Sequence, residues 1–351
     1  MKKRYVTVLI LALLMIPTLL SANSETAATV NLIREEVITY DDLRSKVEEE
    51  QKQLQSAGEQ TASVDPQRIL DVMINDILVL QGAERDGYLV SDAQIEQVIA
   101  QQKASLSQQT GQNITDAQYE MSIMNVYGVT LSEFKAMLRD SSTVDQYVRN
   151  TQQSVINVYG EPTEDEINAF FRTNRSQFMN PELVRLSHIF MPFDESDKAS
   201  VKKEMDKVSR YLKYNTYTFE ELVPTYSQDA DSIDRGGDIG WLAFDDTQMR
   251  QALGPEFFDA VFELKLGKPS GVLESNSGFH IVKVITHTEP KLLSLTDRIN
   301  PESSTTVKEY IKKTLTDRLR QQAYLKGIDS LVAQLRSQAS IDISYTGESI
   351  L

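Results

Sequence analysis

Apolar residues recur at helical spacing through the first half of the chain. Behind Asp65 and Pro66, a helix N-cap and first-turn pair, they repeat every three to four residues: Ile69, Leu70, Met73, Ile77, Leu78 and Leu80. Four further helix starts carry the capping-box pattern, a hydroxyl followed three residues later by Glu or Gln: Ser91/Gln94, Thr115/Gln118, Thr130/Glu133 and Thr163/Glu166. Residues 40–178 are therefore predicted to be mainly helical. The Gln-, Ser- and Thr-rich stretch 101–112 fits either an exposed connection or a polar helix face.

Extended segments are predicted at both ends of the chain. Residues 29–38 alternate loosely around Glu35-Glu36 and predict a short hairpin, and residues 341–345 predict a strand that can join it. Before this strand lies a long amphipathic helix, whose apolar residues are Val307, Ile311, Leu315, Leu319, Ile328, Leu331 and Leu335. A helix of this length must pack on another element. The two ends of the chain are therefore expected to form one composite helical domain.

The pattern changes at Pro181, where β-branched runs, Gly pairs and short helical segments begin. This region holds all three His and the only Trp. We expect an α+β protein in which a separate α/β domain is inserted into the mainly helical domain. The expected limits are 1–22 for an N-terminal targeting segment, 23–180 for the helical part, 181–290 for the inserted domain, and 291–351 for the helix and strand that pack back on the helical part.

The first residues have the layout of a secretory signal peptide. Lys2, Lys3 and Arg4 precede the uncharged apolar run 6–20, which is followed by Ser21 and Ala22. The run is shorter than the roughly 20 apolar residues of a membrane span and contains Pro17. We therefore expect export to the periplasm with no stable membrane insertion after signal removal. Anchoring by an uncleaved signal is the alternative.

The composition of the chain excludes several kinds of partner and site. The chain has 36 Lys and Arg against 51 Asp and Glu, a net charge of -15, and no Cys. Such acidity disfavours nucleic acid as a partner, and the lack of Cys excludes thiol nucleophiles, disulfides, Cys-ligated zinc and a lipid anchor on Cys. The absence of disulfides fits a bacterial envelope protein. No cofactor or metal is expected, since Asp229, Asp231, Asp234 and Asp238 lack the spacing of a calcium loop.

Three segments of the inserted domain carry its candidate chemistry. They are Val184-Arg-Leu-Ser-His188-Ile, then Tyr226-Ser-Gln-Asp229 leading to Arg235-Gly-Gly-Asp-Ile239-Gly-Trp241, and Ser277-Gly-Phe-His280-Ile-Val. In this order and spacing, over about 105 residues, they resemble the parvulin family of peptidyl-prolyl cis/trans isomerases.

The resemblance implies an active site residue by residue. The paired histidines of the family fall on His188 and His280, its hydroxyl beside the second histidine on Ser277, and its Cys-or-Asp position on Asp229. Its apolar proline pocket falls on Ile239, Met249 and Phe257. About four extra residues between Gly240 and Phe257 make Leu253 an alternative to Met249. Phosphate recognition is not expected, because the loop 191–197 is acidic where the phosphate-accepting branch is basic.

The chemistry of these residues suits rotation about an X-Pro bond, a barrier of about 18–20 kcal/mol that requires no nucleophile. An apolar socket can hold the proline ring while polar groups favour the twisted amide. Buried histidines can also serve structure alone. The alternatives are therefore a non-catalytic chaperone or binding protein with a vestigial isomerase domain, and a hydrolase using His188 or His280 with a Ser.

The surrounding architecture is similar to SurA-type periplasmic chaperones and the related PrsA-type foldases. The similarity rests on the early hairpin, the helix order and the stretch Ile74-Asn-Asp-Ile77-Leu-Val-Leu80. It departs from PrsA in lacking the anchor Cys, and from the best-known SurA pattern in having one isomerase domain. The implied partners are unfolded or nascent envelope and outer-membrane polypeptides that contain X-Pro bonds.

Overall fold

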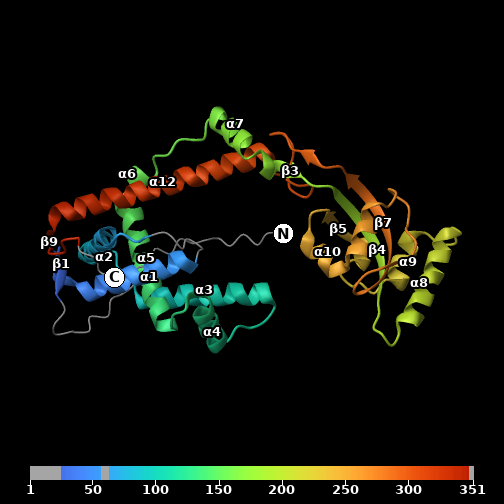
Figure 1. Cartoon of the computed structure of the whole chain (residues 1–351), viewed down its shortest axis with the longest axis horizontal. Helices are drawn as coiled ribbons and strands as arrows, with labels where there is room; N and C mark the ends of the chain where they lie inside the picture. Colours follow the sequence, from blue (N-terminus) through green and yellow to red (C-terminus); the bar gives the residue numbers. More distant parts are fainter. Residues whose placement is uncertain (1–24, 57–62, 348–351) are drawn as a thin grey trace. The chain divides into compact units, whose positions relative to one another are not determined.

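The computed structural model describes residues 25–56 and 63–347, and the expected signal segment 1–22 lies outside this range. The chain forms two compact units (Figure 1). The first runs to Glu161 and is completed by the chain from Asp317 onwards, and the second is Pro162–Thr316. The predicted fold class, a mixed helix and sheet protein with a mainly helical part, is confirmed.

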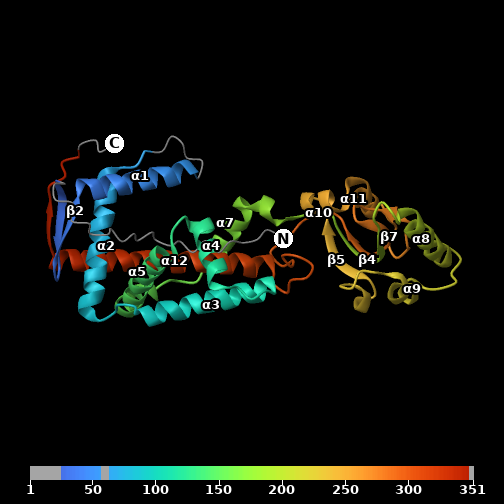
Figure 2. The same cartoon turned by 90° about the horizontal axis from the view of Figure 1, so that it is seen from below.

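Helices dominate the first unit (Figure 2). They are α1 (Tyr40–Ser56), α2 (Pro66–Asp86), α3 (Asp92–Thr110), α4 (Asp116–Tyr127), α5 (Leu131–Thr151), α6 (Gln153–Ile156) and the later part of α12 (Val307–Gln338). The capping boxes that begin α3, α4 and α5 are all closed in both directions, and Asp65 caps α2, as predicted. The stretch 101–112 is helical as far as Thr110 and largely exposed, so its polar composition reflects a solvated helix face.

A three-stranded sheet joins the two ends of the chain. Strands β1 (Thr26–Asn31), β2 (Glu35–Thr39) and β9 (Ser340–Ile343) lie in the order β2-β1-β9. Val30 is paired with Glu36 on one side and Ile341 on the other, which confirms the hairpin and the closing strand. Leu331 and Leu335 of α12 are buried in the same core as α2 and this sheet.

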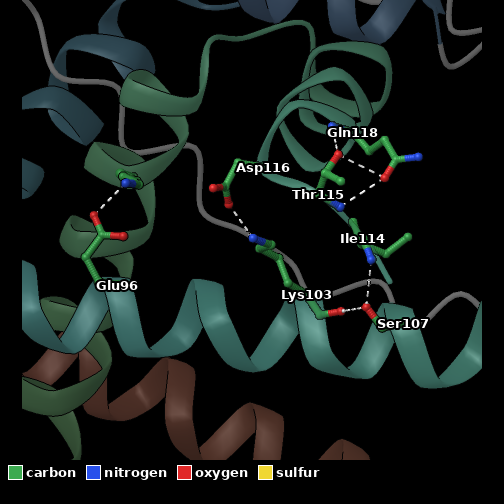
Figure 3. Close-up of polar contacts among 8 residues, drawn as sticks. Glu96, Lys103, Ser107, Ile114, Thr115, Asp116 and Gln118 are labelled. Carbon is green, nitrogen blue, oxygen red and sulfur yellow. Dashed lines mark hydrogen bonds and ion pairs between the residues drawn. The ribbon is translucent and has the colours of Figure 1, made fainter. Parts of the chain in front are cut away.

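Polar contacts fasten α4 to α3 (Figure 3). Lys103 of α3 pairs with Asp116 in the first turn of α4, and the backbone N–H of Ile114 donates to Ser107 Oγ over 3.1 Å. Beneath these contacts a small apolar core includes Tyr119, Ile123 and residues of α3 and α5. The α3–α5 group is thereby a packed cluster of its own within the first unit.

The second unit is built around a four-stranded antiparallel sheet. Its strands are β4 (Leu183–Pro192), β5 (Asp238–Ala243), β6 (Leu273–Glu274) and β7 (Gly278–Thr288), in the order β5-β4-β7-β6. Helices α8 (Lys198–Lys213) and α9 (Phe219–Tyr226) pack on one face with Ile189 and Ile281. Helix α11 (Pro255–Phe262), preceded by α10 (Thr247–Leu253), packs on the other with Leu186 and Val282.

A smaller core lies beside this sheet in the second unit. It joins α7 (Glu164–Thr173), η1 (Arg175–Phe178) and the first turns of α12, with β3 (Met179–Asn180) paired to β8 (Lys291–Leu292). Because these elements pack together, the compact units divide at 161/162 and 316/317. The expected domain limits at 180/181 and 290/291 stay a prediction. Among the described residues, no helix is both long and apolar enough to cross a bilayer.

Candidate functional site

Strands β4 and β7 place the two histidines on one face of the sheet. His188 lies opposite Val282 and His280 opposite Phe190, and alternation puts all of these side chains on the face covered by α11. Both histidines are buried, with 7% and 3% of their surface exposed. Their Nδ1 atoms are 3.2 Å apart, within hydrogen-bond distance.

A loop after α9 brings Asp229 to His188. The N–H of Gln228 donates to the carbonyl of Phe190 over 2.7 Å, and the N–H of His188 donates to the carbonyl of Gly237 over 2.8 Å, so the loop is tied to β4 on both sides. Asp229 Oδ2 then lies 2.9 Å from His188 Nε2. Gly237 has φ +80°, and a Cβ there would meet the His188 carbonyl oxygen at 2.4 Å, which explains the second glycine of the pair in the motif.

A serine completes the contacts on the other side of the pair. His280 Nε2 lies 2.8 Å from Oγ of Ser275, not of Ser277. Ser277 is one step further, with its Oγ 3.2 Å from Ser275 Oγ and its N–H donating to that atom over 3.2 Å. Ser277, the hydroxyl expected beside His280, is therefore connected to that histidine only through Ser275.

Electrostatics fix the protonation of this chain of groups. Burial lowers the pKa of His188, against the opposing effect of Asp229. Burial and the neighbouring His188 lower the pKa of His280 to about 3. Burial raises the pKa of Asp229, but hydrogen bonds from Ser232 and His188 outweigh it and the pKa is lowered overall. At neutral pH both imidazoles are therefore neutral and the carboxyl is ionised.

The ionised carboxylate gives the hydrogen bonds a direction. Because Asp229 can only accept, His188 carries its proton on Nε2 and accepts at Nδ1 from His280 Nδ1–H. His280 Nε2 then accepts from the hydroxyl of Ser275. The result is a continuous series of hydrogen bonds from Ser275 through two neutral imidazoles to the ionised carboxylate of Asp229.

Aromatic rings lie against the two hydrogen-bonded histidines. Phe257 of α11 is 4% exposed and its ring centroid is 4.5 Å from that of His280. Phe190 is 4.6 Å from His280 and stacks on His188 at 5.6 Å. Phe190 was not among the predicted site residues, although its position two after His188 on a strand would have placed it on the same face.

The other expected pocket residues lie on β5 and α10. Ile239 is the extra residue of an irregularity in the β4–β5 pairing, between Gly240 and Asp238, and is 42% exposed. Met249 is 40% exposed, whereas Leu253, one turn later on the same face of α10, packs partly buried against the core that contains Phe257.

The third histidine of this unit, His287, is half-buried and pairs with Glu182 over 2.7 Å. Within residues 25–56 and 63–347, no three His, Asp or Glu side chains gather as metal ligands would.

Comparison with known proteins finds similarity in two segments of the chain. A family model described as a PPIC-type PPIASE domain matches residues 171–288, which include the whole histidine site, and a SurA-like N-terminal domain model matches residues 2–123. A Chaperone SurA of Pseudoalteromonas translucida is 25% identical over 288 residues, 80% of this chain and 62% of that protein. A Foldase protein PrsA of Clostridium kluyveri is 26% identical over 234 residues, 65% of this chain and 63% of that protein.

Among solved structures, one reported for SurA-like chaperones of Campylobacter jejuni aligns at 17% identity over 73% of this chain and 96% of that chain, with a TM-score of 0.35. The chain spans about three fifths of the length of the two curated relatives, whose covered shares are 62% and 63%.

Proposed function

The chain carries a PPIC-type PPIase domain and a SurA-like N-terminal domain, and from this premise we propose that it catalyses cis/trans isomerisation of X-Pro bonds in other polypeptides. The observation that carries the proposal is the continuous chain from Asp229 through His188 and His280 to Ser275, in contact with the buried ring of Phe257. A catalyst of bond rotation needs polar groups preorganised beside an apolar wall, and this arrangement supplies both.

The proposed mechanism is stabilisation of the twisted amide. When the X-Pro bond rotates, conjugation is lost, so the carbonyl and the amide nitrogen both change their hydrogen-bonding needs. His188, Asp229, Ser277 and His280 hold a polar network beneath the bond, while Phe257, Ile239 and Met249 or Leu253 enclose the proline ring. Both histidines are neutral at pH 7, so they offer dipoles of fixed direction, and the charge of the network is that of the Asp229 carboxylate.

We further propose that the clients are unfolded envelope polypeptides and that the chain reaches them by export to the periplasm after removal of residues 1–22. Relatives named Chaperone SurA and Foldase protein PrsA support handling of polypeptides in general. The segment 1–22, with its three leading cations and apolar run, supports export. Amino-terminal sequencing of the protein recovered from the periplasmic fraction tests this, since recovery of an intact Met1 in membranes would contradict it.

The isomerase proposal is tested with the full chain in a protease-free assay on a proline peptide. Replacing Asp229 by Asn removes the charge that orients both histidines, and we expect kcat/KM to fall about ten- to a hundredfold. Asp234→Asn, at an exposed position of the same loop, is the matched control and should leave the rate unchanged. Wild-type activity no greater than the uncatalysed rate would instead favour the non-catalytic chaperone.

A further inference from the structure

A cavity of about 430 Å³ lies in the first, mainly helical unit, whereas the histidine site lies in the second. Its lining comes from the end of α5, the last residue of α6 and the chain just after it, and one face of α12: Arg149, Ile156, Asn157, Tyr159, Arg320, Gln321 and Tyr324. The volume falls within the range of ordinary ligand pockets. Two of its seven lining residues are arginines in a chain with a net charge of -15.

Close packing fixes the wall of this cavity. Gly327 of α12 faces α6, and a side chain at this glycine would lie 2.5 Å from Ile156 Cγ2 and 3.5 Å from Val148 Cγ1. The absence of a side chain lets the two helices approach. Tyr324, three residues earlier on α12, is thereby held opposite Arg149, whose guanidinium carbon lies 5.3 Å from the ring centroid.

Neighbouring side chains hold both guanidinium groups in place through contacts to their Nε atoms. Arg149 Nε lies 2.8 Å from both carboxylate oxygens of Asp145. Arg320 Nε donates to the hydroxyl of Tyr159 over 2.8 Å and its guanidinium carbon lies 5.5 Å from that ring, while Nη1 is 3.6 Å from Asp317. Among the described residues, these contacts leave both terminal nitrogens of Arg149 and Nη2 of Arg320 available to a ligand.

We propose that this cavity binds a carboxylate carried beside an apolar side chain in an extended polypeptide. Arginine terminal nitrogens recognise carboxylates with directed hydrogen bonds. The rings of Tyr159 and Tyr324 with Ile156 offer contact to an adjacent apolar or aromatic side chain, and the amides of Asn157 and Gln321 can pair with a peptide backbone. The inference rests on the proposed function in taking an unfolded client as the source of the segment.

The test uses the full chain and a short fluorescent peptide with the central sequence Leu-Glu-Phe, blocked at both ends. Anisotropy should show tighter binding of this peptide than of its Leu-Gln-Phe counterpart. Arg320→Gln and Arg149→Gln should each weaken binding of the Glu peptide about three- to tenfold, and should leave the Gln peptide unchanged. Lys326→Gln is the matched control, because Lys326 is an exposed cation of α12 outside the cavity lining.

A third peptide, with Gln in the centre and a free carboxyl end after Phe, separates a terminal carboxylate from a side-chain one. Arginine-dependent binding of either acidic peptide supports the proposal and names the source. Equal binding of the Glu and Gln blocked peptides together with no arginine dependence of the free-ended peptide overturns it. If Lys326→Gln weakens binding of the Glu peptide as much as the arginine substitutions do, the proposal is also overturned. Isomerase activity, measured in parallel, should be unchanged in all three variants, so failure here is distinct from failure of the isomerase proposal.

Discussion

Asp229 sets the direction of the hydrogen bonds that run from it through the two histidines to Ser275. As an ionised acceptor it determines the tautomer of His188, which in turn determines that of His280 and makes Ser275 the donor at the far end. The carboxylate therefore influences a hydroxyl that it does not touch.

Ser275 should matter more than Ser277. Ser275→Ala leaves the buried Nε2 of His280 without a partner, at a cost of about 1–3 kcal/mol in the free energy of unfolding, and we expect a larger loss of isomerase rate than for Ser277→Ala. Urea unfolding and the proline-peptide assay measure the two effects. A greater rate loss for Ser277→Ala would show that Ser277 has a direct role that its contact with Ser275 does not explain.

Stability of the second unit should depend on pH through His280. Its pKa is about 3 in the folded chain against about 6.5 when unfolded, so the unfolded chain binds the proton first as pH falls. The contribution is complete above about pH 6.5 and declines below it, by about 2 kcal/mol between pH 7 and pH 5. Asp229, whose pKa is also lowered, loses its contribution only below about pH 4, outside this window, whereas His188, whose pKa is lowered by burial, adds to the decline within it.

The measurement is urea unfolding at pH 7 and pH 5, followed by fluorescence of Trp241, the single Trp, which lies on β5. His280→Gln should be less stable at pH 7 and should show a smaller decline to pH 5 than the wild type. An identical decline in both proteins would mean that other groups cause the pH dependence.

At the scale of elements, α2 is the helix on which the helical unit is assembled. It contributes a long row of buried residues to the core shared with β1, β9 and α12. Gly82 lies where it meets two neighbours: a side chain there would come within 2.8 Å of Leu335 Cδ2 and 3.1 Å of the Tyr147 ring. The glycine permits three helices to converge.

Gly82→Ala should therefore destabilise the helical unit. The gain in helix propensity is about 1 kcal/mol, but overpacking a filled core costs about 1–3 kcal/mol, so the net effect is expected to be unfavourable. Circular dichroism reports the loss, while Trp241 fluorescence should still report an unchanged second unit. The control is Gly160→Ala, where the added carbon meets no atom within 4 Å. Equal effects at both positions would contradict the packing argument.

At the scale of the molecule, the segment that contains the four-stranded sheet begins and ends on two paired strands. Met179 is paired with Leu292 and Asn180 with Lys291 in the two-stranded β3–β8 sheet. Phe178, Leu293 and Val307 pack in a core of their own, separate from the two cores of the four-stranded sheet. A two-residue hairpin turn can therefore close the gap if residues 181–290 are removed.

Such a deletion, with Asn-Gly joining Asn180 to Lys291, should leave a folded protein that still suppresses aggregation of an unfolded client but has no isomerase activity. Light scattering of a diluted, denatured client checks the first property and the proline-peptide assay the second. Circular dichroism must show the helical content retained. A folded deletion protein without suppression would place client binding in the removed segment.

The sequence alone determined the features that depend on neighbours within about four residues. Capping boxes at Ser91, Thr115 and Thr130 predicted helix starts because both partners lie on one turn. His188, Asp229 and His280 were predicted as one site by the resemblance of their motifs to the parvulin family, and the structure brings them within hydrogen-bond distance. Alternation along β4 could also have identified Phe190.

Tertiary structure decided what depends on strand register, bulges and distant packing. It placed Ser275 rather than Ser277 against His280, because the turn before β7 interrupts the strand alternation. It also brought Arg149 and Tyr159 to Arg320 and Tyr324 across a long separation in the chain, which no local pattern encodes. Local hydrogen bonds follow from spacing, whereas contacts between distant segments exist only once the whole core has formed.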